Sequence, residues 1–374
     1  MNPLAIVLLG YNRINCYIEI LNSLNNLESS RNDITLVLSF EYNSSKDIID
    51  YAYNFEWKFG KKIIVEHQTQ LGLRKHFIWA GDQTEKYTNV IFLEDDLFVS
   101  PQLIDLADSF ISTYKNDDKV AGCSFYAPLI CEFNRTRFYP IDDGNDAFFL
   151  QHPYWGNLWM KKKWSMFKDW FAKYKRNNSI LPTYVQRWGL SSFKVVYIQY
   201  LIETSRYIVY PRISLVNNMG RAGVHNKKDS LFFQVPILMG HKDFQLKSFD
   251  ESLAVYDSSF EIDVNILKKT NPLLSKYDFC VNLQNNYEHY NKEYILTHGN
   301  DTEAILSFSN RCKPYESAII QNIQGNGIEL IKNTNSHNRY KDLWFLDFRK
   351  NNMFARAISL KFILRFLKYL FTKR

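Results

Sequence analysis

The chain has 374 residues, of which 46% are hydrophobic and 16% aromatic, and its formal net charge is +7. This length allows either one large domain with an appendage or two domains. No run of about twenty apolar residues occurs, which argues against a membrane-spanning helix, and the basic residues are too dispersed for a nucleic-acid-binding protein.

The amino terminus and the cysteines indicate an intracellular protein. Residues 1–3 lead directly into an apolar run without a basic segment or a small-residue cleavage site, so no secretory signal is predicted. The five cysteines form no Cys-x-x-Cys pair and have no histidine at zinc spacing, which is typical of reduced thiols in a cytosol. We therefore expect a cytoplasmic protein, and the Asn-, Lys- and Ile-rich composition favours a bacterial one.

Short apolar runs alternate with helical patterns over the first hundred residues. The strands are predicted at 4–9, 34–40, 62–67 and 89–96, and the helices at 14–27, 45–59 and 73–86. Such alternation predicts a parallel sheet with helices on both faces, where ligands bind beyond the carboxyl ends of the strands. Two polar segments follow predicted strands, Tyr11-Asn12-Arg13 and Glu94-Asp95-Asp96, and we expect both at one rim of the sheet.

The pattern becomes less regular after residue 97. We predict a helix at 101–115, a short strand at 120–127, a helix at 190–205 and a strand pair that leads to His225. The predicted domains are 1–250, an extension at 251–350 to which no fold can be assigned, and a basic amphipathic helix at 351–374.

The acidic tripeptide 94–96 is the clearest candidate site. Carboxylates crowded after a buried strand repel one another unless a cation neutralises them. Oxygen ligands on a turn suit Mn²⁺ or Mg²⁺, which keep positions open for substrate phosphates. The alternative is an exposed acidic turn in which Asp96 or Ser100 caps the helix that begins near Pro101. These residues alone leave both interpretations open.

The wider context of the tripeptide resembles the GT-A fold glycosyltransferases. NVIFLEDDLFVSP (89–101) resembles their strand-to-metal turn, and the N-acetylglucosaminyltransferase I type also carries Glu-Asp-Asp there. The segments IVLLGYNR, LVLSFE and KHFIWAGDQ resemble further family segments in the same order. The resemblance covers about residues 4–230 and is strongest in 4–101. It implies a Rossmann-like α/β fold in which a nucleotide-sugar binds with a divalent cation.

The resemblance also implies roles for individual residues. The direct metal bond falls to Asp96, the sugar or ribose contacts fall to Glu94 and Asp95, and a nucleobase contact falls to Glu41. The remaining donor-binding residues implied are Tyr11, Asn12, Arg13 and His76.

Two downstream segments extend the resemblance. PYWGNLWMKKKW (153–164) resembles the Gly-Trp platform under the transferred sugar, which nominates Trp155 and Gly156, whereas Trp159 and Trp164 fit core packing equally well. NNMGRAGVH (217–225) resembles a loop that closes on the donor. His225 is there either a second metal ligand or a surface histidine.

The general base is the main departure from the family. Inverting members carry a carboxylate in a Trp-Asp-Asp-Trp-like segment, but the equivalent stretch here, TYVQRW (183–188), contains no acid. Gln186 is not ionisable and cannot take a proton from an acceptor hydroxyl. Other candidates are Asp142, Asp143 and Asp169, with the first two preferred, so inverting chemistry is an expectation.

Residues 353–374 combine apolar side chains with Lys361, Arg365 and Lys368 on one narrow helical face and contain no acids. This pattern is typical of a helix lying in a membrane interface that binds anionic lipid. The alternative is a carboxyl-terminal helix docked on the protein.

These observations predict a metal-dependent glycosyltransferase, peripheral on the inner face of the cell membrane. It would transfer a sugar from a UDP-sugar to an acceptor that is either a glycan or a lipid-linked oligosaccharide. The product would belong to a surface polysaccharide such as lipopolysaccharide or capsule. One alternative is a nucleotide-sugar nucleotidyltransferase, although GYNRIN lacks the Gly-rich phosphate loop of that class. Another is a non-catalytic GT-A relative that binds glycans or acts as a scaffold. The absence of a general base from the expected segment is consistent with this alternative.

Overall fold

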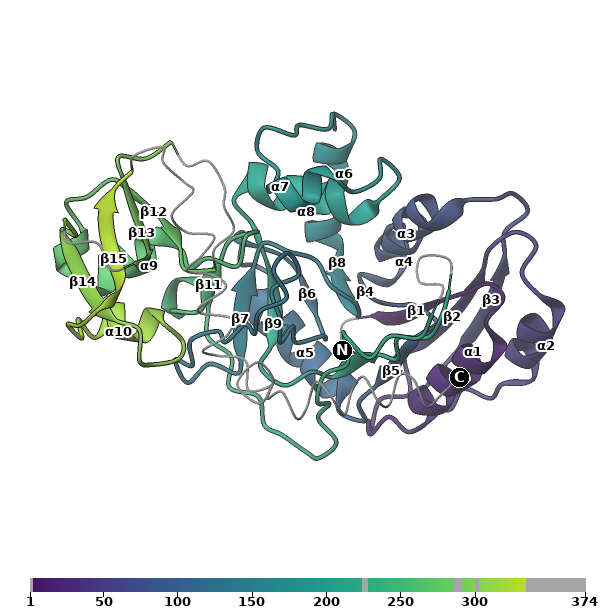
Figure 1. Cartoon of the computed structure of the whole chain (residues 1–374). Coiled ribbons are helices and arrows are strands. Elements are labelled where there is room, and N and C mark those ends of the chain that lie inside the picture. Colours follow the sequence, from purple (N-terminus) through teal and green to yellow (C-terminus); the bar gives the residue numbers. More distant parts are fainter. Residues whose placement is uncertain (1–2, 224–227, 285–290, 300–302, 334–374) are drawn as a thin grey trace, which may run out of the picture. The chain divides into compact units, whose positions relative to one another are not determined.

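The structure is a computed structural model that describes residues 3–223, 228–284, 291–299 and 303–333 (Figure 1). The chain forms two compact units. The first contains the described residues of 1–129 and 140–260, and the second contains residues 130–139 together with the described residues of 261–333. The predicted first domain was continuous and ended at 250, whereas in the structure the first unit reaches 260 and residues 130–139 belong to the second unit.

The first unit is built on a nine-stranded sheet with the order β11-β7-β9-β6-β8-β4-β1-β2-β3. Its strands are β1 (Leu4–Gly10), β2 (Thr35–Phe40), β3 (Lys62–Glu66), β4 (Asn89–Leu93), β6 (Val120–Ser124), β7 (Ala147–Leu150), β8 (Asn157–Met160), β9 (Tyr207–Pro211) and β11 (Val255–Tyr256). The pairs β1–β2, β2–β3, β1–β4, β6–β9 and β7–β11 are parallel, whereas β4–β8, β6–β8 and β7–β9 are antiparallel. The predicted α/β fold with a mostly parallel sheet is confirmed.

Helices cover both faces of this sheet (Figure 1). On one face lie α1 (Ile14–Asn25), α2 (Lys46–Asn54) and α5 (Leu103–Tyr114); on the other lie α3 (Gly72–Asp82), α4 (Thr84–Tyr87), α6 (Lys161–Phe171), α7 (Thr183–Gln186) and α8 (Phe193–Thr204). Every residue of β1 and β4 is buried between the two layers. This burial explains why both strands are continuous apolar runs in the sequence and do not alternate.

A small second sheet and a short helix complete the first unit. β5 (Leu97–Val99) pairs antiparallel with β10 (Val216–Asn218), and the 3-10 helix η1 spans Phe249–Glu251. The β5–β10 pair joins the segment after the acidic tripeptide to the segment before residues 219–223. It therefore connects two regions that are far apart in the chain.

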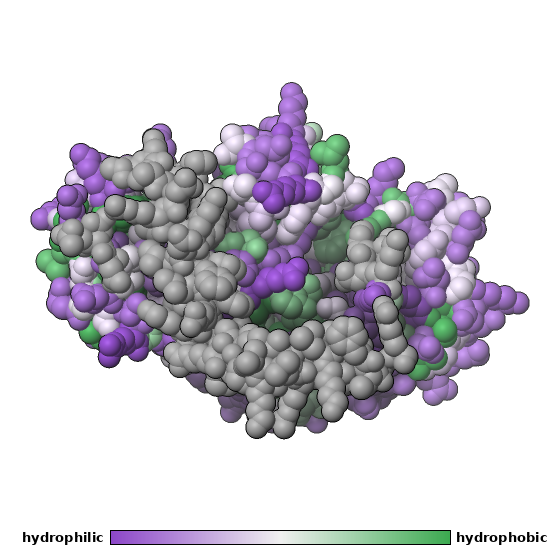
Figure 2. Space-filling model, in the orientation of Figure 1, coloured by the Kyte–Doolittle hydropathy of each residue, from purple (hydrophilic) through white to green (hydrophobic). Residues whose placement is uncertain are grey.

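The many aromatic residues of the first unit mainly fill its core. Trp159 and Trp164 are each 2% exposed, and their rings pack against each other with centroids 4.6 Å apart. A Cβ at Gly81 would come within 2.1 Å of the Trp164 ring, so a glycine on α3 is required for this close packing. Both tryptophans therefore pack in the core, which was one of the two roles considered for them from the sequence. On the face drawn in Figure 2, hydrophobic residues are mostly recessed between hydrophilic ones.

The second unit contains a four-stranded sheet with the order β12-β13-β15-β14. Its elements are α9 (Val264–Thr270), η2 (Pro272–Leu274), β12 (Phe279–Asn282), β13 (Tyr294–Gly299), β14 (Leu306–Ser309), α10 (Glu316–Ile320) and β15 (Gly327–Lys332). No fold was predicted for this region, because its strands are short and only weakly periodic in the sequence. The amphipathic helix predicted at 351–374 lies outside the described residues. Within the described ranges, no helix has the length and apolar character needed to cross a membrane.

Candidate functional site

The carboxyl ends of β1, β2 and β4 meet at one edge of the nine-stranded sheet. Gly10 of β1 is in register with Phe40 of β2, and Leu8 of β1 is in register with Leu93 of β4. The residues that follow these strands therefore lie side by side, as the alternation of strands and helices predicted.

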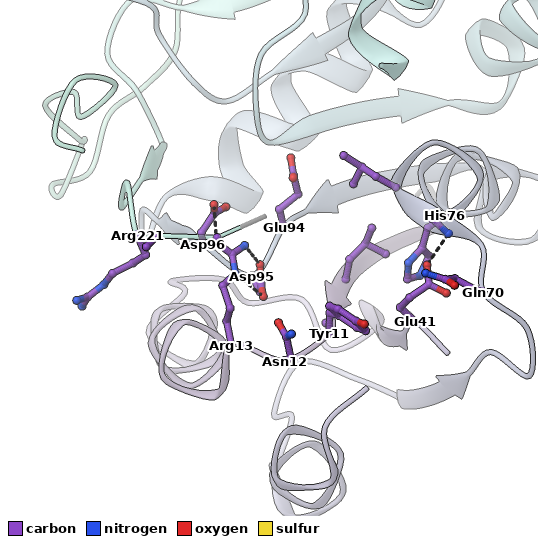
Figure 3. Close-up of a pocket in the computed structure, with 16 residues that line it drawn as sticks. Tyr11, Asn12, Arg13, Glu41, Gln70, His76, Glu94, Asp95, Asp96 and Arg221 are labelled. Carbon is purple, nitrogen blue, oxygen red and sulfur yellow. Dashed lines mark hydrogen bonds and ion pairs between the residues drawn. The ribbon is translucent and has the colours of Figure 1, made fainter. Parts of the chain in front are cut away.

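A pocket of about 750 Å³ opens at this edge (Figure 3). Eight of the residues nominated from the sequence line it: Tyr11, Asn12, Arg13, Glu41, His76, Glu94, Asp95 and Asp96. The remaining lining residues are Leu9, Gly10, Gln70, Gly72, Leu73, Arg221, Ala222 and Gly223. Arg13 and the acidic tripeptide lie toward one end, and Glu41, Gln70 and His76 are grouped toward the other.

Arg13 bridges two of the acids at the first end. Its Nε donates to Asp95 Oδ2 at 3.2 Å, its Nη2 donates to Asp95 Oδ1, and its Nη1 donates to Asp96 Oδ2 at 3.2 Å. A Cβ at Gly223 would lie 2.9 Å from Arg13 Nη1, so the guanidinium is enclosed between the acids and a glycine. Such a two-sided arrangement fixes the orientation of both carboxylates.

The acidic tripeptide remains short of positive charge despite this pairing. Burial, together with the carboxylates of Asp96 and Asp95, raises the pKa of Glu94 to about 8. Burial also raises the pKa of Asp95, although Arg13 opposes the change. The Oδ1 atom of Asp96 is buried and has no hydrogen-bond partner among the described residues. A buried carboxylate oxygen without a donor is costly and suits a cation.

Three carboxylates do not by themselves form a closed metal site. Among the residues that the structure describes, no group of three His, Cys, Asp or Glu side chains could hold a metal ion. His225, the second ligand considered from the sequence, lies outside the described residues. A cation at Asp96 would accordingly keep coordination positions open, as Mg²⁺ and Mn²⁺ do when they bind substrate phosphates.

His76 reaches the pocket from α3 through a buried polar cluster. Its Nε2 lies 2.7 Å from Ser39 Oγ, and the same hydroxyl lies 3.1 Å from His67 Nε2. Burial, followed by the charge of His67, lowers the pKa of His76 to about 4, although Glu41 opposes the change. At neutral pH the His76 ring is therefore uncharged and acts as a hydrogen-bonding group.

Glu41 also lies at this end, where its carboxylate accepts backbone hydrogen bonds from Tyr42, Leu71 and Gly72 at 2.7 to 2.9 Å. Burial alone would raise the pKa of Glu41, but these three N–H groups outweigh it and the pKa is lowered. Glu41 is therefore an ionised carboxylate that already has partners at both oxygens.

Arg221 also lines the pocket, although it was not among the site residues predicted from the sequence. The amide of Met219 donates to the carbonyl of Asp96 at 2.9 Å, which brings the segment after β10 to the pocket. The guanidinium of Arg221 points away from the acids and pairs with Glu19 at 2.7 Å, and both side chains are substantially exposed. The one sequence feature that could have indicated Arg221 as a site residue is its position between two glycines in NNMGRAGVH.

Trp155 and Gly156 do not line the pocket. The Trp155 ring packs on Tyr126 and Phe233 with centroid distances of 5.0 and 5.2 Å. Gly156 has a φ of +63°, and a Cβ there would come within 2.8 Å of Val216. Their contacts describe an aromatic wall outside the pocket, and a role under a transferred sugar stays a prediction.

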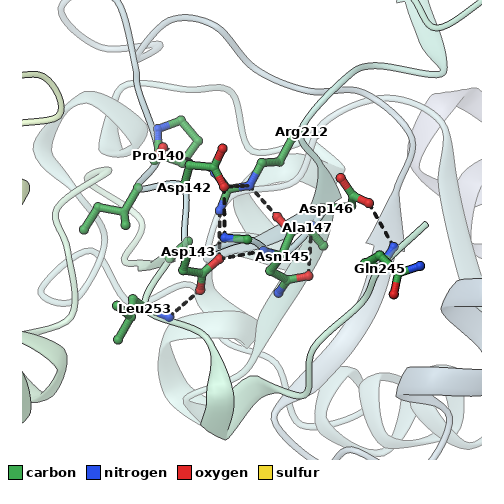
Figure 4. Close-up of polar contacts among 12 residues, drawn as sticks. Pro140, Asp142, Asp143, Asn145, Asp146, Ala147, Arg212, Gln245 and Leu253 are labelled. Atoms are coloured by element: carbon green, nitrogen blue, oxygen red, sulfur yellow. Dashed lines mark hydrogen bonds and ion pairs between the residues drawn. The ribbon is translucent and has the colours of Figure 1, made fainter. Parts of the chain in front are cut away.

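Asp142 and Asp143, the two preferred base candidates, do not line the pocket either. Figure 4 shows the polar contacts around them. Asp143 accepts hydrogen bonds from the Leu253 amide at 2.7 Å, from Ser252 Oγ at 3.0 Å and from Arg212 Nη2 at 3.2 Å. Burial would raise the pKa of Asp143, but these bonds and that from the Asn145 amide lower it. Asp142 is largely exposed, 3.8 Å from Arg212. The contacts of Asp143 favour a structural role in the loop before β7.

Comparisons with known proteins give similar structures but no family. No family model matches the chain, and neither does any curated protein. Residues 1–349 of TarS from S. aureus, in complex with UDP-GlcNAc, are similar with 15% sequence identity and a TM-score of 0.42, over 60% of each chain. Mannosyltransferase PcManGT from Pyrobaculum calidifontis, in complex with GDP-Man and Mn²⁺, has 10% identity and a TM-score of 0.33 over 43% of this chain and 46% of that chain. This chain thus spans less than two thirds of the length of either structure.

Proposed function

We propose that this chain is a metal-dependent glycosyltransferase that moves a sugar from a nucleotide diphosphate donor, a UDP-sugar, to a glycan or lipid-linked acceptor. The observation that carries the proposal is the composition of the 750 Å³ pocket. Residues from four separate segments, each resembling a donor-binding segment of the GT-A glycosyltransferases, line this one cavity. The pocket also lies beyond the carboxyl ends of parallel strands, where such folds bind ligands.

The charge balance of the pocket supports a metal. Its lining contains four carboxylic acids, Glu41, Glu94, Asp95 and Asp96, against the two guanidinium groups of Arg13 and Arg221. Even with Glu94 protonated, the acids outnumber the arginines. A diphosphate brings further negative charge, so it would be repelled unless a cation bound with it.

Asp96 is the residue that would hold this cation. Arg13 occupies Oδ2 of Asp96, and Oδ1 is the buried oxygen without a partner. When bound, the metal would offset the charge that develops on the departing nucleotide diphosphate. The role of Arg13 is to orient Asp96 and to limit the repulsion between the two aspartates.

Other side chains of the pocket would bind the donor directly. The ion pair of Arg221 with Glu19 is exposed and therefore weak, so little free energy opposes a turn of Arg221 toward a phosphate. A phosphate accepts charge-assisted hydrogen bonds from arginine, which are stronger than neutral ones. Uncharged His76 would contact the nucleotide without adding charge to the pocket.

The general base stays unassigned within this proposal. Asp142 and Asp143 remain candidates from the sequence, but the contacts of Asp143 weigh against it. Inversion at the anomeric carbon is therefore proposed from the family resemblance alone. Proton NMR of the first-formed product would give its anomeric configuration. A product that retains the donor's configuration would contradict inversion and leave the transferase activity standing.

The proposed acceptor is a membrane-associated glycan of a bacterial surface polysaccharide, with the enzyme peripheral on the cytoplasmic face. The support is the basic, apolar pattern of residues 353–374. An enzyme bound to the membrane surface would encounter a lipid-linked acceptor by diffusion along that same surface.

A panel of nucleotide-sugars tests the proposal. Thermal unfolding is measured with each nucleotide-sugar in the presence of Mn²⁺, since a ligand that binds the folded state raises the unfolding temperature. We expect at least one UDP-sugar to stabilise the protein only when Mn²⁺ is present. The non-catalytic alternative is separated by slow release of UDP from that donor without acceptor, which a transferase shows and a scaffold does not. Stabilisation by no nucleotide-sugar would contradict the proposed function.

A further inference from the structure

We propose that Glu41 is a positioning residue that clamps residues 71 and 72 at the start of α3. In this role it shapes the pocket wall that carries Gln70 and His76, and it does not read the nucleobase itself. The inference rests on the proposed function, because this wall is taken to contact the donor nucleotide. It assigns Glu41 a different role from the direct base contact that the family resemblance implied.

The contacts of Glu41 are those of a clamp between two distant segments. Oε1 accepts from the amide of Leu71 at 2.8 Å, and Oε2 accepts from the amide of Gly72 at 2.7 Å. The amide of Tyr42 donates to Oε1 at 2.9 Å, which holds the carboxylate against its own backbone. Both oxygens thus accept from protein N–H groups, which come from the turn after β2 and from the N-cap and first residue of α3. Hydrogen bonds to an ionised acceptor are about twice as strong as neutral ones.

Helix α3 needs this carboxylate because its own sequence provides no cap. Leu71 precedes the helix and makes no side-chain cap hydrogen bond. Gly72, the first residue of α3, has a φ of +68°, which is a left-handed and not a helical backbone conformation. The regular hydrogen bonding of the helix therefore does not hold this residue in place. The first amides of a helix lack partners within the helix, and a carboxylate beside them is favourable. Glu41 supplies it from 31 residues away in the chain.

The clamped segment carries the groups that face the nucleotide end of the pocket. His76 lies about one turn into α3, and Gln70 immediately precedes the clamped amides (Figure 3). An adjoining cavity of about 390 Å³ shares two residues with the main pocket; it is lined by Tyr11, Tyr42, Asn43, Gln68, Thr69 and Gln70. These six side chains are uncharged; three are carboxamides, which can pair with a base, and two are exposed tyrosine rings, which can stack on one. Base recognition would then fall to this segment, and Glu41 would hold the segment in place.

The test uses Glu41→Gln, with Glu66→Gln as the matched control. A carboxamide has one acceptor oxygen, so Glu41→Gln places an NH₂ against one of the two clamped amides. Glu66 ends β3, and its carboxylate accepts a hydrogen bond from the Tyr53 hydroxyl of α2 at 2.9 Å. Hydrogen–deuterium exchange of residues 69–76 is measured without ligand. UDP affinity and the kinetics of UDP-sugar hydrolysis are measured with Mn²⁺.

A clamp predicts that Glu41→Gln speeds exchange of the Leu71 and Gly72 amides in the ligand-free protein by about tenfold or more. The Kd of UDP and the KM of the donor rise by about tenfold, while kcat changes by less than about twofold, because Glu41 does not contact the acids at the other end of the pocket. Glu66→Gln leaves all of these values unchanged.

Two results would overturn the inference. If UDP affinity falls while ligand-free exchange is unchanged, Glu41 contacts the base directly. If exchange rises and UDP affinity is unchanged, the clamp has no role in donor binding. A wild-type protein that binds no member of a panel of nucleoside diphosphates overturns the proposed function, and with it the donor-binding half of this inference; the exchange measurement then reports on the clamp alone.

Discussion

The Nη1 atom of Arg13 donates to Oδ2 of Asp96 at 3.2 Å, while the other carboxylate oxygen of Asp96 is buried without a partner among the described residues. One side chain thereby fixes the aspartate and leaves a single oxygen for a further cation. This relationship connects the first strand of the sheet to the acidic tripeptide after the fourth. Because Arg13 also pairs with Asp95, it reduces the repulsion between the two aspartates.

Arg13→Ala should weaken both the fold and donor binding. Its removal leaves two partly buried carboxylates without their cation, which we expect to lower the free energy of unfolding by about 2–4 kcal/mol in the absence of metal. Added Mn²⁺ should restore part of this loss, and the donor Kd should rise by about tenfold or more. Denaturant unfolding with and without Mn²⁺ measures the first effect and calorimetry the second. Arg311→Ala, an exposed arginine of the second unit, is the control; equal stability of both variants would contradict the bridging role.

His76 should titrate far below an ordinary histidine. Its pKa of about 4 in the folded state lies below the 6.5 of the unfolded chain. Between these values the unfolded state binds the proton more tightly, so the contribution of His76 to stability is present above pH 6.5 and is lost as pH falls toward 4. The loss would be about 3 kcal/mol. Two-dimensional NMR of the ring follows the titration directly.

Substitution of His76 separates its two roles. His76→Gln should remove this part of the acid slope in urea unfolding, and His76→Ala should raise the donor Kd by about tenfold. His241→Gln, at an exposed histidine, serves as the control for both measurements. A ring that titrates near 6.5, or an unchanged donor Kd, would contradict the position assigned to His76.

Glu316 should make the second unit less stable at neutral pH than in mild acid. Burial raises its pKa to about 7, above the 4.5 of the unfolded chain, although its backbone contact and Lys313 oppose the change. The folded state therefore binds the proton more tightly, and stability falls as pH rises from 4.5 to 7, by about 3 kcal/mol. Glu316→Gln should remove this loss.

Hydrogen exchange of β12 to β15 as a function of pH measures the stability of the second unit by itself. Asp278→Asn, in an exposed ion pair with Lys292, is the comparison variant. If Glu316→Gln and the wild-type protein show the same pH dependence, Glu316 is not the group responsible.

Residues 353–374 should bind anionic membranes. Lys361, Arg365 and Lys368 would each contribute on the order of 1 kcal/mol near the headgroups, and the apolar side chains would add more. High salt should weaken binding only in part, because it screens charge and not apolar burial. Co-sedimentation with anionic vesicles measures this for the intact protein and for a chain ending at residue 352, which should remain soluble and turn over a water-soluble acceptor. Intact protein that stays in the supernatant, or a truncated chain that unfolds, would instead favour a docked helix.

The parts of the fold that the sequence predicted are those governed by local pattern. β1 and β4 are buried on both faces, so they appear as uninterrupted apolar runs, and the polar residues that end them mark the rim of the sheet. The pocket residues from Tyr11 to Asp96 followed from this pattern and from the resemblance. Their neighbours in space were correctly expected because parallel strands align their carboxyl ends.

The parts that were missed depend on pairing between distant segments. Arg221 reaches the pocket because β10 pairs with β5, and no local feature of residues 216–223 specifies that pairing. The contacts of Asp143 with Ser252 and Leu253 were not predicted either, because these partners come from a segment more than a hundred residues later. The inclusion of residues 130–139 in the second unit is equally invisible to a local pattern.

Metal-dependent hydrolysis of a UDP-sugar, compared between the wild-type protein and Asp96→Asn, is the sharpest test of a cation held by Asp96 in a glycosyltransferase. Asp118→Asn, an exposed aspartate outside the pocket, is the matched control. We expect wild type and Asp118→Asn to release UDP with Mn²⁺ and to stop when the metal is chelated, while Asp96→Asn stays folded and loses at least about a hundredfold in rate. Equal rates for Asp96→Asn and wild type, or UDP release that persists in full under chelation, would contradict this expectation.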